Sequence, residues 1–282
     1  MFSSDSLVWC GVGFVSIFVV KYSYYHLMKG VVESVLHSKY EGEERIYKVN
    51  SVLKLSLDSI FYSFTTILAY FLFRQEYWFP SIVGGCGECA QIYKEYPNWP
   101  TNTANLEMYF MIQLGVHIFS VFEMIVIKRK TERKFYELLL HHFVAATLIL
   151  FSMMCNEIAA GSMILIIHDM SDIMIAFGRA FIETKFESRN KTLVVYISMT
   201  LIWIYLRIVV FPFCLLANVY ANKPTSQDEW NIISFEYSYL LCMAFVLYGM
   251  HIFWTYFLIK IGVRSAQGEK VNNVHDDAAK EK

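Results

Sequence analysis

The chain has 282 residues and a formal net charge of −1, with 24 lysines and arginines against 25 aspartates and glutamates. Hydrophobic residues make up 56% of the sequence and charged residues 17%, whereas soluble domains have about 45–50% and about 25%. Together with a mean hydropathy of +0.40, this composition excludes an ordinary soluble domain and an intrinsically disordered chain. The balanced charge offers no overall attraction to a polyanion, so we expect a lipid bilayer as the surroundings and no nucleic-acid partner.

Seven apolar stretches are long enough to cross a bilayer as helices, which takes about 20 residues. In chain order they are residues 7–28, 52–73, 106–127, 136–155, 159–182, 193–217 and 233–260. Lys21 interrupts the first stretch, and a secretory signal peptide is the rival interpretation there. Residues 1–6 carry no lysine or arginine, however, and no small-x-small cleavage site follows, so we expect a retained helix. The sequence therefore predicts an all-α integral membrane protein, a bundle of about seven transmembrane helices.

The lysines and arginines outside these stretches alternate between the two sides of the membrane. Seventeen lie in residues 29–51, 128–135 and 183–192 and in the tail from 260, and three lie in residues 74–105 and 218–232. Because positive charges accumulate in cytosolic loops, this asymmetry places the C-terminus in the cytosol and the N-terminus on the lumenal or outer side. We therefore divide the chain into an N-terminal membrane helix with a cytosolic loop (1–51), a membrane domain (52–261) and a disordered cytosolic tail (262–282).

Two cysteines lie close together in the predicted lumenal loop 74–105, where Cys86 and Cys89 form the sequence Cys-Gly-Glu-Cys. Disulfides persist in oxidising compartments, so the pair predicts a structural bridge or two idle thiols. A redox-active pair would be expected in a βαβ context, which this sequence does not offer. The other four cysteines lie inside the predicted spans.

The fourth and fifth stretches carry a dense set of polar residues. In chain order the set comprises His141, His142, Ser152, Asn156, His168, Asp169, Ser171, Asp172 and Arg179. An ionisable residue at the centre of a membrane helix costs about 2.5–3.5 kcal/mol on insertion scales, so such a cluster indicates a functional site. The short link at Asn156 makes the two helices antiparallel neighbours. Arg207, in the sixth stretch, is the natural counter-charge for Asp169 or Asp172.

The cluster suits more than one chemistry. A histidine beside a carboxylate can act as a general base, and an imidazole can also carry an acyl group as a nucleophile. Either role fits acyl transfer to an amine or a hydroxyl from a donor in cytosolic water, such as acyl-CoA. A proton-coupled channel would use the same residues, and His and Asp are also ligands for zinc or iron. The repeated His-x-x-His-His runs of membrane di-iron enzymes are absent from the sequence, so we expect no metal site. His117 and His251, each taken alone, are typical of hydrogen bonds between helices.

Residues 141–179 closely resemble the longevity-assurance motif of ceramide synthases, the signature of the TLC domain. Ten of thirteen motif positions are identical and at the family spacing, namely His141, His142, Leu148, Ser152, Asn156, Gly161, His168, Asp169, Ser171 and Asp172. The departures are Ile175, Ala176 and Arg179, where the family has Leu, Glu and Lys. Ala176 lacks a carboxylate, which puts in doubt an acidic contact with a substrate amine near the cytosolic mouth.

The resemblance implies a sphingosine N-acyltransferase of the endoplasmic reticulum membrane, with 52–261 as its catalytic TLC domain, acyl-CoA as co-substrate and no permanently bound cofactor. It implies that His141 and His142 act as nucleophile or base, that Asp169 and Asp172 orient and stabilise them, and that His168 assists. Ser152, Asn156 and Ser171 would hold the helices together or bind charge in an intermediate, Gly161 would permit close packing, and Arg179 and Arg207 would support substrate binding.

Two alternatives belong to other classes of protein. A non-enzymatic TLC-domain protein, lipid-sensing or associated with the translocon, would share the fold, but such proteins usually lack the full set of paired histidines and aspartates. A seven-span receptor is suggested only by the number of stretches. The sequence leaves open the acyl-chain length, the sphingoid base and whether the protein forms a homodimer or a heterodimer.

Overall fold

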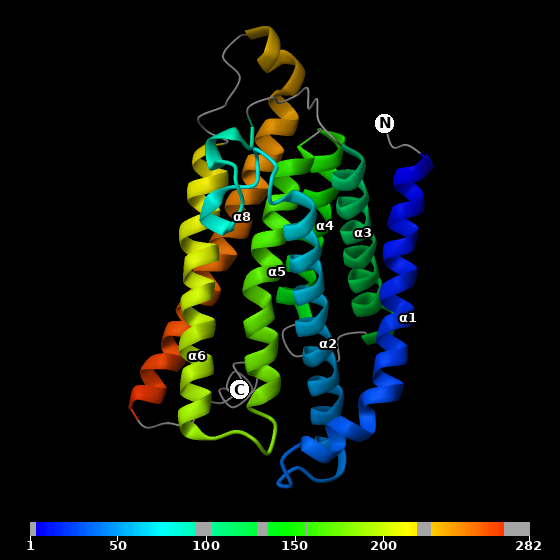
Figure 1. Cartoon of the computed structure of the whole chain (residues 1–282), viewed down its shortest axis with the longest axis vertical. Helices are drawn as coiled ribbons and strands as arrows, with labels where there is room; N and C mark the ends of the chain where they lie inside the picture. The colour runs from blue at the N-terminus through cyan, green and yellow to red at the C-terminus, as the bar shows by residue number, and fades with distance from the viewer. Residues whose placement is uncertain (1–3, 94–102, 129–134, 156, 219–226, 268–282) are drawn as a thin grey trace.

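The computed structural model of the chain describes residues 4–93, 103–128, 135–155, 157–218 and 227–267 (Figure 1). The long helices in these ranges are α1 (Ser4–Val35), α2 (Gly42–Phe73), α3 (Thr103–Phe122), α4 (Phe135–Met154), α5 (Ile158–Phe181), α6 (Arg189–Trp203) and α8 (Gln227–Ala266). Two short 3₁₀ helices, η1 (Ser81–Val83) and η2 (Cys89–Gln91), lie in the loop after α2. Apart from two isolated bridges, the described residues contain no β-structure.

Six helical segments are long and apolar enough to cross a membrane, and α4 contains a shorter apolar helix, Leu138–Met154. Each of the seven stretches predicted from the sequence coincides with a helix, and successive helices run in alternating directions (Figure 1). The first turn of α1 and the last turn of α8 consequently lie at opposite ends of the bundle. The chain is a multi-pass helical membrane protein.

The helices extend further than their apolar segments. We predicted a loop over 29–51, but α1 continues to Val35 and α2 begins at Gly42. Each of these helices has 32 residues, a length of about 48 Å against a hydrocarbon core of about 30 Å. Lys48 can lie in a buried helical turn because Glu183 accepts a hydrogen bond from its Nζ at 2.8 Å. At the other end of the chain, α8 continues to Ala266 and so enters the segment from 262 that we expected to be disordered.

Three stretches of π-helix follow the regular helices. The helix α3 runs into η3 (Glu123–Lys128), and α6 runs into η4 (Ile204–Val210) and η5 (Pro212–Leu216). Pro212 lacks the backbone N–H that would close an α-helical turn, which explains a wider turn beside it. Such turns change the direction in which side chains point and are frequent at functional sites. The buried Arg207 lies in η4.

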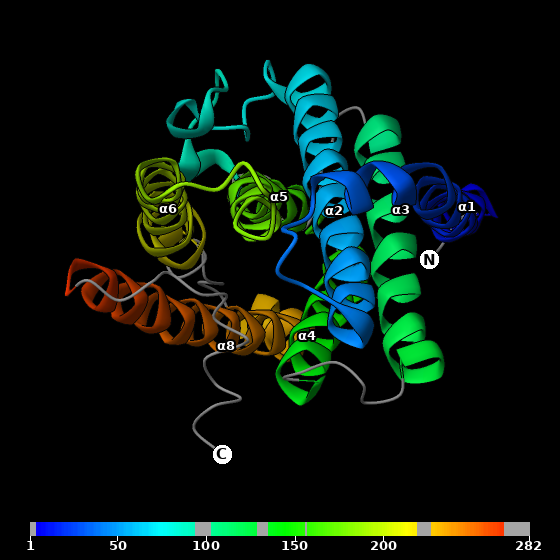
Figure 2. The same cartoon turned by 90° about the horizontal axis from the view of Figure 1, so that it is seen from below.

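Seen from below, α5 is surrounded by α2, α3, α4, α6 and α8, while α1 lies outermost and packs on α3 (Figure 2). The contact between α1 and α3 depends on two glycines. A Cβ atom at Gly13 would overlap the carbonyl of Ile112, and one at Gly115 would overlap the carbonyl of Cys10. Small residues allow membrane helices to approach in this way. Lys21, the residue that interrupts the first apolar stretch, forms an ion pair with Glu123 at the end of α3.

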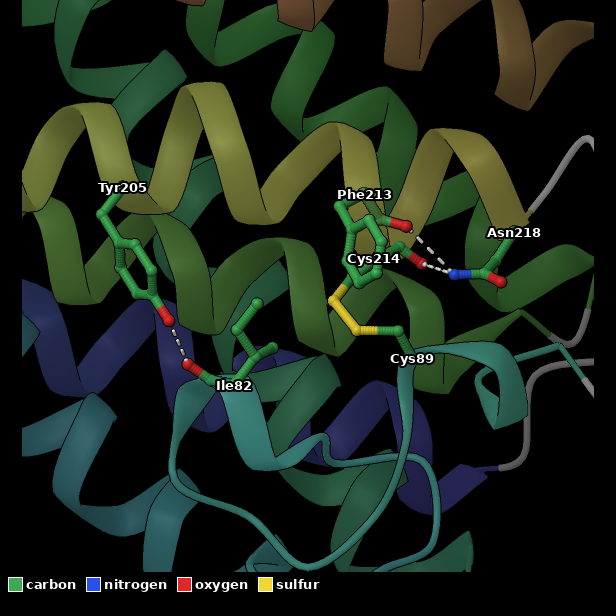
Figure 3. The surroundings of a disulfide bond; sticks show 6 residues. All are labelled: Ile82, Cys89, Tyr205, Phe213, Cys214 and Asn218. Atoms are coloured by element: carbon green, nitrogen blue, oxygen red, sulfur yellow. Dashed lines mark hydrogen bonds between the residues drawn. A yellow bond between two sulfur atoms is a disulfide. The ribbon is translucent and has the colours of Figure 1, made fainter.

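The predicted bridge between Cys86 and Cys89 is wrong. Cys89 forms a disulfide with Cys214 in η5 (Figure 3). Cys86 is an exposed free thiol. The two bridged residues are 125 positions apart, so their spacing in the sequence gave no indication of the pairing. The same loop contacts the helix a second time, where Tyr205 donates a hydrogen bond to the Ile82 carbonyl at 2.7 Å (Figure 3). The loop after α2 is therefore attached to the last turns of the α6 segment.

Candidate active site

A cavity of about 320 Å³ lies inside the helix bundle. Side chains from α1 to α5, η3, η4, α8 and the end of α6 line it. Its titratable lining residues are Lys21, Lys54, Asp58, Tyr62, His117, Glu123, His141, His142, Asp169, Asp172, Arg179 and Arg207. The cavity thus brings together six of the ten site residues that the sequence indicated, including both members of the histidine pair. Apolar and aromatic side chains make up most of the remaining wall.

The histidine pair lies side by side on α4, and both rings reach the cavity. The ring centroids of His141 and His142 are 5.5 Å apart. Trp254 of α8 meets the His141 ring edge to face at 5.3 Å, and His117 of α3 lies 6.4 Å from the His142 ring. Nδ1 of His141 is buried and has no hydrogen-bond partner among the described residues. Aromatic packing, rather than a carboxylate, therefore orients the His141 ring in this conformation.

Asp169 of α5 is buried and accepts two hydrogen bonds from other helices. Thr65 of α2 donates to its Oδ2 at 2.6 Å and Gln113 of α3 donates to the same oxygen at 2.9 Å. We expected this carboxylate to orient the histidine pair, but its bonds tie α2, α3 and α5 together instead. A carboxylate that accepts hydrogen bonds from two neighbouring helices fixes the wall of the cavity at the level of the motif.

Arg207 makes several polar contacts at the site through one guanidinium group. Its guanidinium donates to Ser171 Oγ at 2.6 Å, to Asp172 Oδ1 at 2.8 Å and to the His168 carbonyl at 3.2 Å. It also stacks on Trp203, with the guanidinium carbon 4.7 Å from the ring centroid. The prediction that Arg207 is the counter-charge of one of the two aspartates is confirmed for Asp172. A guanidinium can satisfy several acceptors at once because its donors form a rigid fork.

His168 lies behind the cavity wall rather than in it. Its Nδ1 is 2.6 Å from the Ile164 carbonyl, and since a carbonyl only accepts, this nitrogen carries a proton. Its Nε2 is 3.0 Å from Nε2 of His251 on α8. That same nitrogen of His251 is 3.0 Å from a guanidinium nitrogen of Arg207 and therefore accepts from it. The prediction that His251 forms a hydrogen bond between helices is confirmed by its bond from Arg207 of η4, and the His168 ring of the motif lies against it.

The other four residues that the sequence indicated lie in different places. Arg179 lines the cavity, and Ser171 lies behind it as a partner of Arg207. Ser152 is buried where α4 approaches α5 at Gly161. A Cβ atom at Gly161 would lie 3.0 Å from the Cβ of Ser152 and 2.7 Å from the Phe110 ring. The expectation of close packing at Gly161 is confirmed. Asn156 lies outside the described residues.

Comparison with known proteins places the chain in a family. A profile described as the TLC domain matches residues 54–260, which is most of the chain. The chain belongs to the TLC domain family. It is 26% identical over 240 residues to "Ceramide synthase hyl-2" of Caenorhabditis elegans, covering 83% of this chain and 70% of that protein. It is also 26% identical over 240 residues to "Ceramide synthase LOH1" of Arabidopsis thaliana, covering 82% and 74%.

The chain covers a smaller share of a mammalian relative. "Ceramide synthase 3" of Mus musculus is 26% identical over 188 residues, which is 66% of this chain but 46% of the mouse protein. The similarity therefore covers about half of the mouse protein. All of the motif residues described above lie within the TLC domain match, whereas α1 lies before it.

Sequence reasoning missed several polar residues of this TLC domain site. Thr65 and Gln113 bind Asp169. Gln113 is a single polar residue among apolar neighbours, but Thr65 lies beside Thr66, so the sequence offered little signal for either. His117 was expected to form a hydrogen bond between helices, but within the described residues its ring makes only the aromatic contact with His142. The described residues also contain no group of three or more His, Cys, Asp or Glu side chains arranged to hold a metal ion.

Proposed function

We propose that this TLC-domain protein is a ceramide synthase, an acyltransferase that joins a fatty acyl group from acyl-CoA to the amine of a sphingoid base. The observation that carries the proposal is the gathering of the motif residues of α4 and α5 around one cavity. Three relatives from animals and a plant carry the name ceramide synthase, and the motif of this chain matches that family at ten of thirteen positions. A non-enzymatic TLC protein would not need this set of ionisable groups inside a membrane.

In the proposed reaction the acyl carbon loses its bond to the sulfur of coenzyme A and gains a bond to the amine nitrogen, either directly or by way of a histidine that carries the acyl group in between. His141 and His142 are the candidates for the nucleophile that carries the acyl group or for the base that assists the attack. Both lie at the cavity, where a lipid acceptor and an acyl chain would meet. No permanently bound cofactor is required, because acyl-CoA enters as a co-substrate.

The surrounding charges would stabilise the polar intermediate. Arg207 lines the cavity and presents a guanidinium that Asp172 and Ser171 hold in place, which suits an oxyanion formed at the acyl carbonyl. His168 would contribute indirectly, because it lies behind the wall and its backbone carbonyl accepts a hydrogen bond from Arg207. Arg179 lines the cavity near the end of α5 and is a candidate contact for the co-substrate.

We further propose that all seven helical segments, including the shorter α4, cross the endoplasmic reticulum membrane. Seventeen of the loop lysines and arginines then face the cytosol, as does the C-terminus, and the Cys89–Cys214 disulfide lies on the lumenal side. A glycosylation tag inserted after residue 270 should stay unmodified in this topology. Modification of that tag would reverse the orientation without affecting the proposed chemistry.

The activity is tested with microsomes from cells that express the chain and that lack their own ceramide synthases. Labelled sphinganine and acyl-CoA donors from C14 to C26 are supplied, and the ceramide formed is measured. We expect product from the wild type and none above background from the double variant His141→Ala/His142→Ala. If the wild type forms no more ceramide than the double variant with every donor, the protein is not a ceramide synthase.

A further inference from the structure

A third histidine reaches the cavity from outside the motif. His117 lies on α3, which packs beside α4, and its ring centroid is 6.4 Å from that of His142. Contacts on both sides of His117 hold this part of the chain in place. One turn earlier Gln113 donates to Asp169, and further along Glu123 pairs with Lys21 of α1. The orientation of the His117 ring toward the cavity is therefore set by contacts that the ring itself does not make.

The His117 ring has no hydrogen-bond partner among the residues that the structure describes, and its one recorded contact is aromatic. A histidine that tied two helices together would donate to or accept from a neighbouring helix, as His251 does. Placing an unbonded imidazole inside a membrane bundle is costly. A polar group of a substrate bound in the cavity can supply the missing hydrogen-bond partner and so offset this free-energy cost.

The distance between the two rings suits a single bridging atom. Hydrogen bonds to nitrogen span about 2.7–3.2 Å between heavy atoms, and two rings whose centroids are 6.4 Å apart do not bond to each other directly. A polar atom of the substrate can lie between them and reach both. An amine nitrogen in this position has the histidine pair on one side and His117 on the other.

We propose that His117 is a catalytic residue that accepts the proton which the attacking amine loses. This inference rests on the proposed ceramide synthase activity. As the nitrogen–carbon bond forms and the bond from the acyl carbon to its leaving group breaks, one N–H proton passes from the amine to the imidazole of His117. The resulting imidazolium then returns that proton to the departing group, which is the thiolate in a direct transfer and the ring of His141 or His142 where that histidine carries the acyl group. The final products are the amide and the free thiol, and His117 is neutral again. A neutral imidazole is suited to both transfers because its unprotonated ring nitrogen can take up a proton and release it again.

Other ionisable groups share the cavity with His117, and a pH study has to take them into account. They are Lys21 on α1, Lys54, Asp58 and Tyr62 on α2, Glu123 on η3, His141 and His142 on α4, Asp169, Asp172 and Arg179 on α5, and Arg207 on η4. The experiment therefore compares a variant with the wild type at each pH, so that titrations common to both proteins cancel.

The test uses the full chain and replaces His117 by glutamine, which keeps a hydrogen-bonding group of similar length but cannot take up the proton. With sphinganine and acyl-CoA at saturating concentrations, we expect kcat of His117→Gln to fall about 100-fold near neutral pH. The KM values should stay close to those of the wild type. Between about pH 7 and pH 9.5 the deficit should narrow, because hydroxide becomes more abundant and can take up the proton that the variant side chain cannot accept. The matched control His26→Gln replaces an exposed histidine of α1 and should keep wild-type activity.

Three outcomes would overturn the inference while the proposed function stands. They are a wild-type kcat in His117→Gln, a rise in KM without a fall in kcat, and a deficit that is the same at every pH. If His117→Gln does not fold, as judged by its melting temperature and elution from a sizing column, His117→Asn replaces it. A wild type that forms no ceramide contradicts the proposed function, and the inference falls with it.

Discussion

The most informative perturbation of this structure is the removal of the Arg207 guanidinium. In Arg207→Met the side chain keeps its approximate volume but loses the hydrogen bonds to Ser171, Asp172 and His251. Arg207 is almost fully buried, with 1% of its side chain exposed, and 26% of the Asp172 side chain is exposed toward the cavity. The substitution therefore leaves a carboxylate inside the bundle with no cation bound to it in the part of the chain that the structure describes.

The magnitude follows from the loss of one partner of a buried ion pair, which costs about 3–5 kcal/mol. Each further acceptor left without a donor adds about 1–3 kcal/mol, and the partial exposure of Asp172 offsets part of this sum. We therefore expect a loss of about 4 kcal/mol. For a chain of this size, 1 kcal/mol corresponds to a change of about 2–4 °C in the melting temperature, so the shift should be about 10 °C.

The assay is thermal unfolding of the purified protein in detergent, monitored by circular dichroism. In the double variant Arg207→Met/Asp172→Asn both charges are gone, and we expect it to regain about 2 kcal/mol relative to the sum of the single variants. Arg45→Met is the matched control. The Arg45 guanidinium donates to the Glu33 and Tyr40 carbonyls near the surface, so its loss should cost no more than about 1 kcal/mol. An Arg207→Met protein that melts within about 2 °C of the wild type, or strict additivity in the double variant, would refute this reasoning.

Three further predictions concern stability. Gly161→Ala should destabilise the protein by about 1–3 kcal/mol because its Cβ would lie 2.7 Å from a buried phenylalanine ring, whereas Gly11→Ala, with open space around it, should be neutral; equal melting temperatures would contradict this. Cys89→Ser should lower the melting temperature because it opens a loop of 125 residues, worth at most about 5 kcal/mol by chain entropy, and Cys86→Ser should not. Burial raises the pKa of Glu157, in the link between α4 and α5, from its ordinary 4.5 to about 8. Its contribution to stability is therefore full below about pH 4.5 and is lost as the pH rises through about 8, and Glu157→Gln should remove this part of the pH dependence of the melting temperature.

The sequence predicted those features that depend on local composition. The seven helical segments could be predicted from runs of apolar residues, because a chain that crosses a membrane has to do so as apolar helices. The site could be predicted from the ionisable residues within those runs, because such residues are costly inside a membrane. The pairing of Arg207 with Asp172 was within reach for the same reason. Helix ends were less predictable, since the turn that contains Lys48 is stabilised by a distant partner, Glu183.

Features that depend on contacts between distant segments were missed. Two nearby cysteines suggested a local bridge, but the fold brings Cys89 to Cys214. We expected Asp169 to bind a histidine, whereas Thr65 and Gln113 approach it more closely because α2 and α3 pack on α5. Spacing along one helix shows which side chains share a face, but it does not show which neighbouring helix that face meets.

The position of α1 has a consequence for how the cavity is enclosed. Ile17 and Lys21 of α1 form part of its wall, yet the TLC domain match begins only at residue 54. A protein trimmed to residues 54–260 would keep every motif residue, but its cavity would lack the part of the wall that α1 supplies and would be open to lipid there. One part of the wall therefore carries the motif and another part does not, so a substitution at Ile17 or Lys21 can change the shape of the cavity without touching a motif residue.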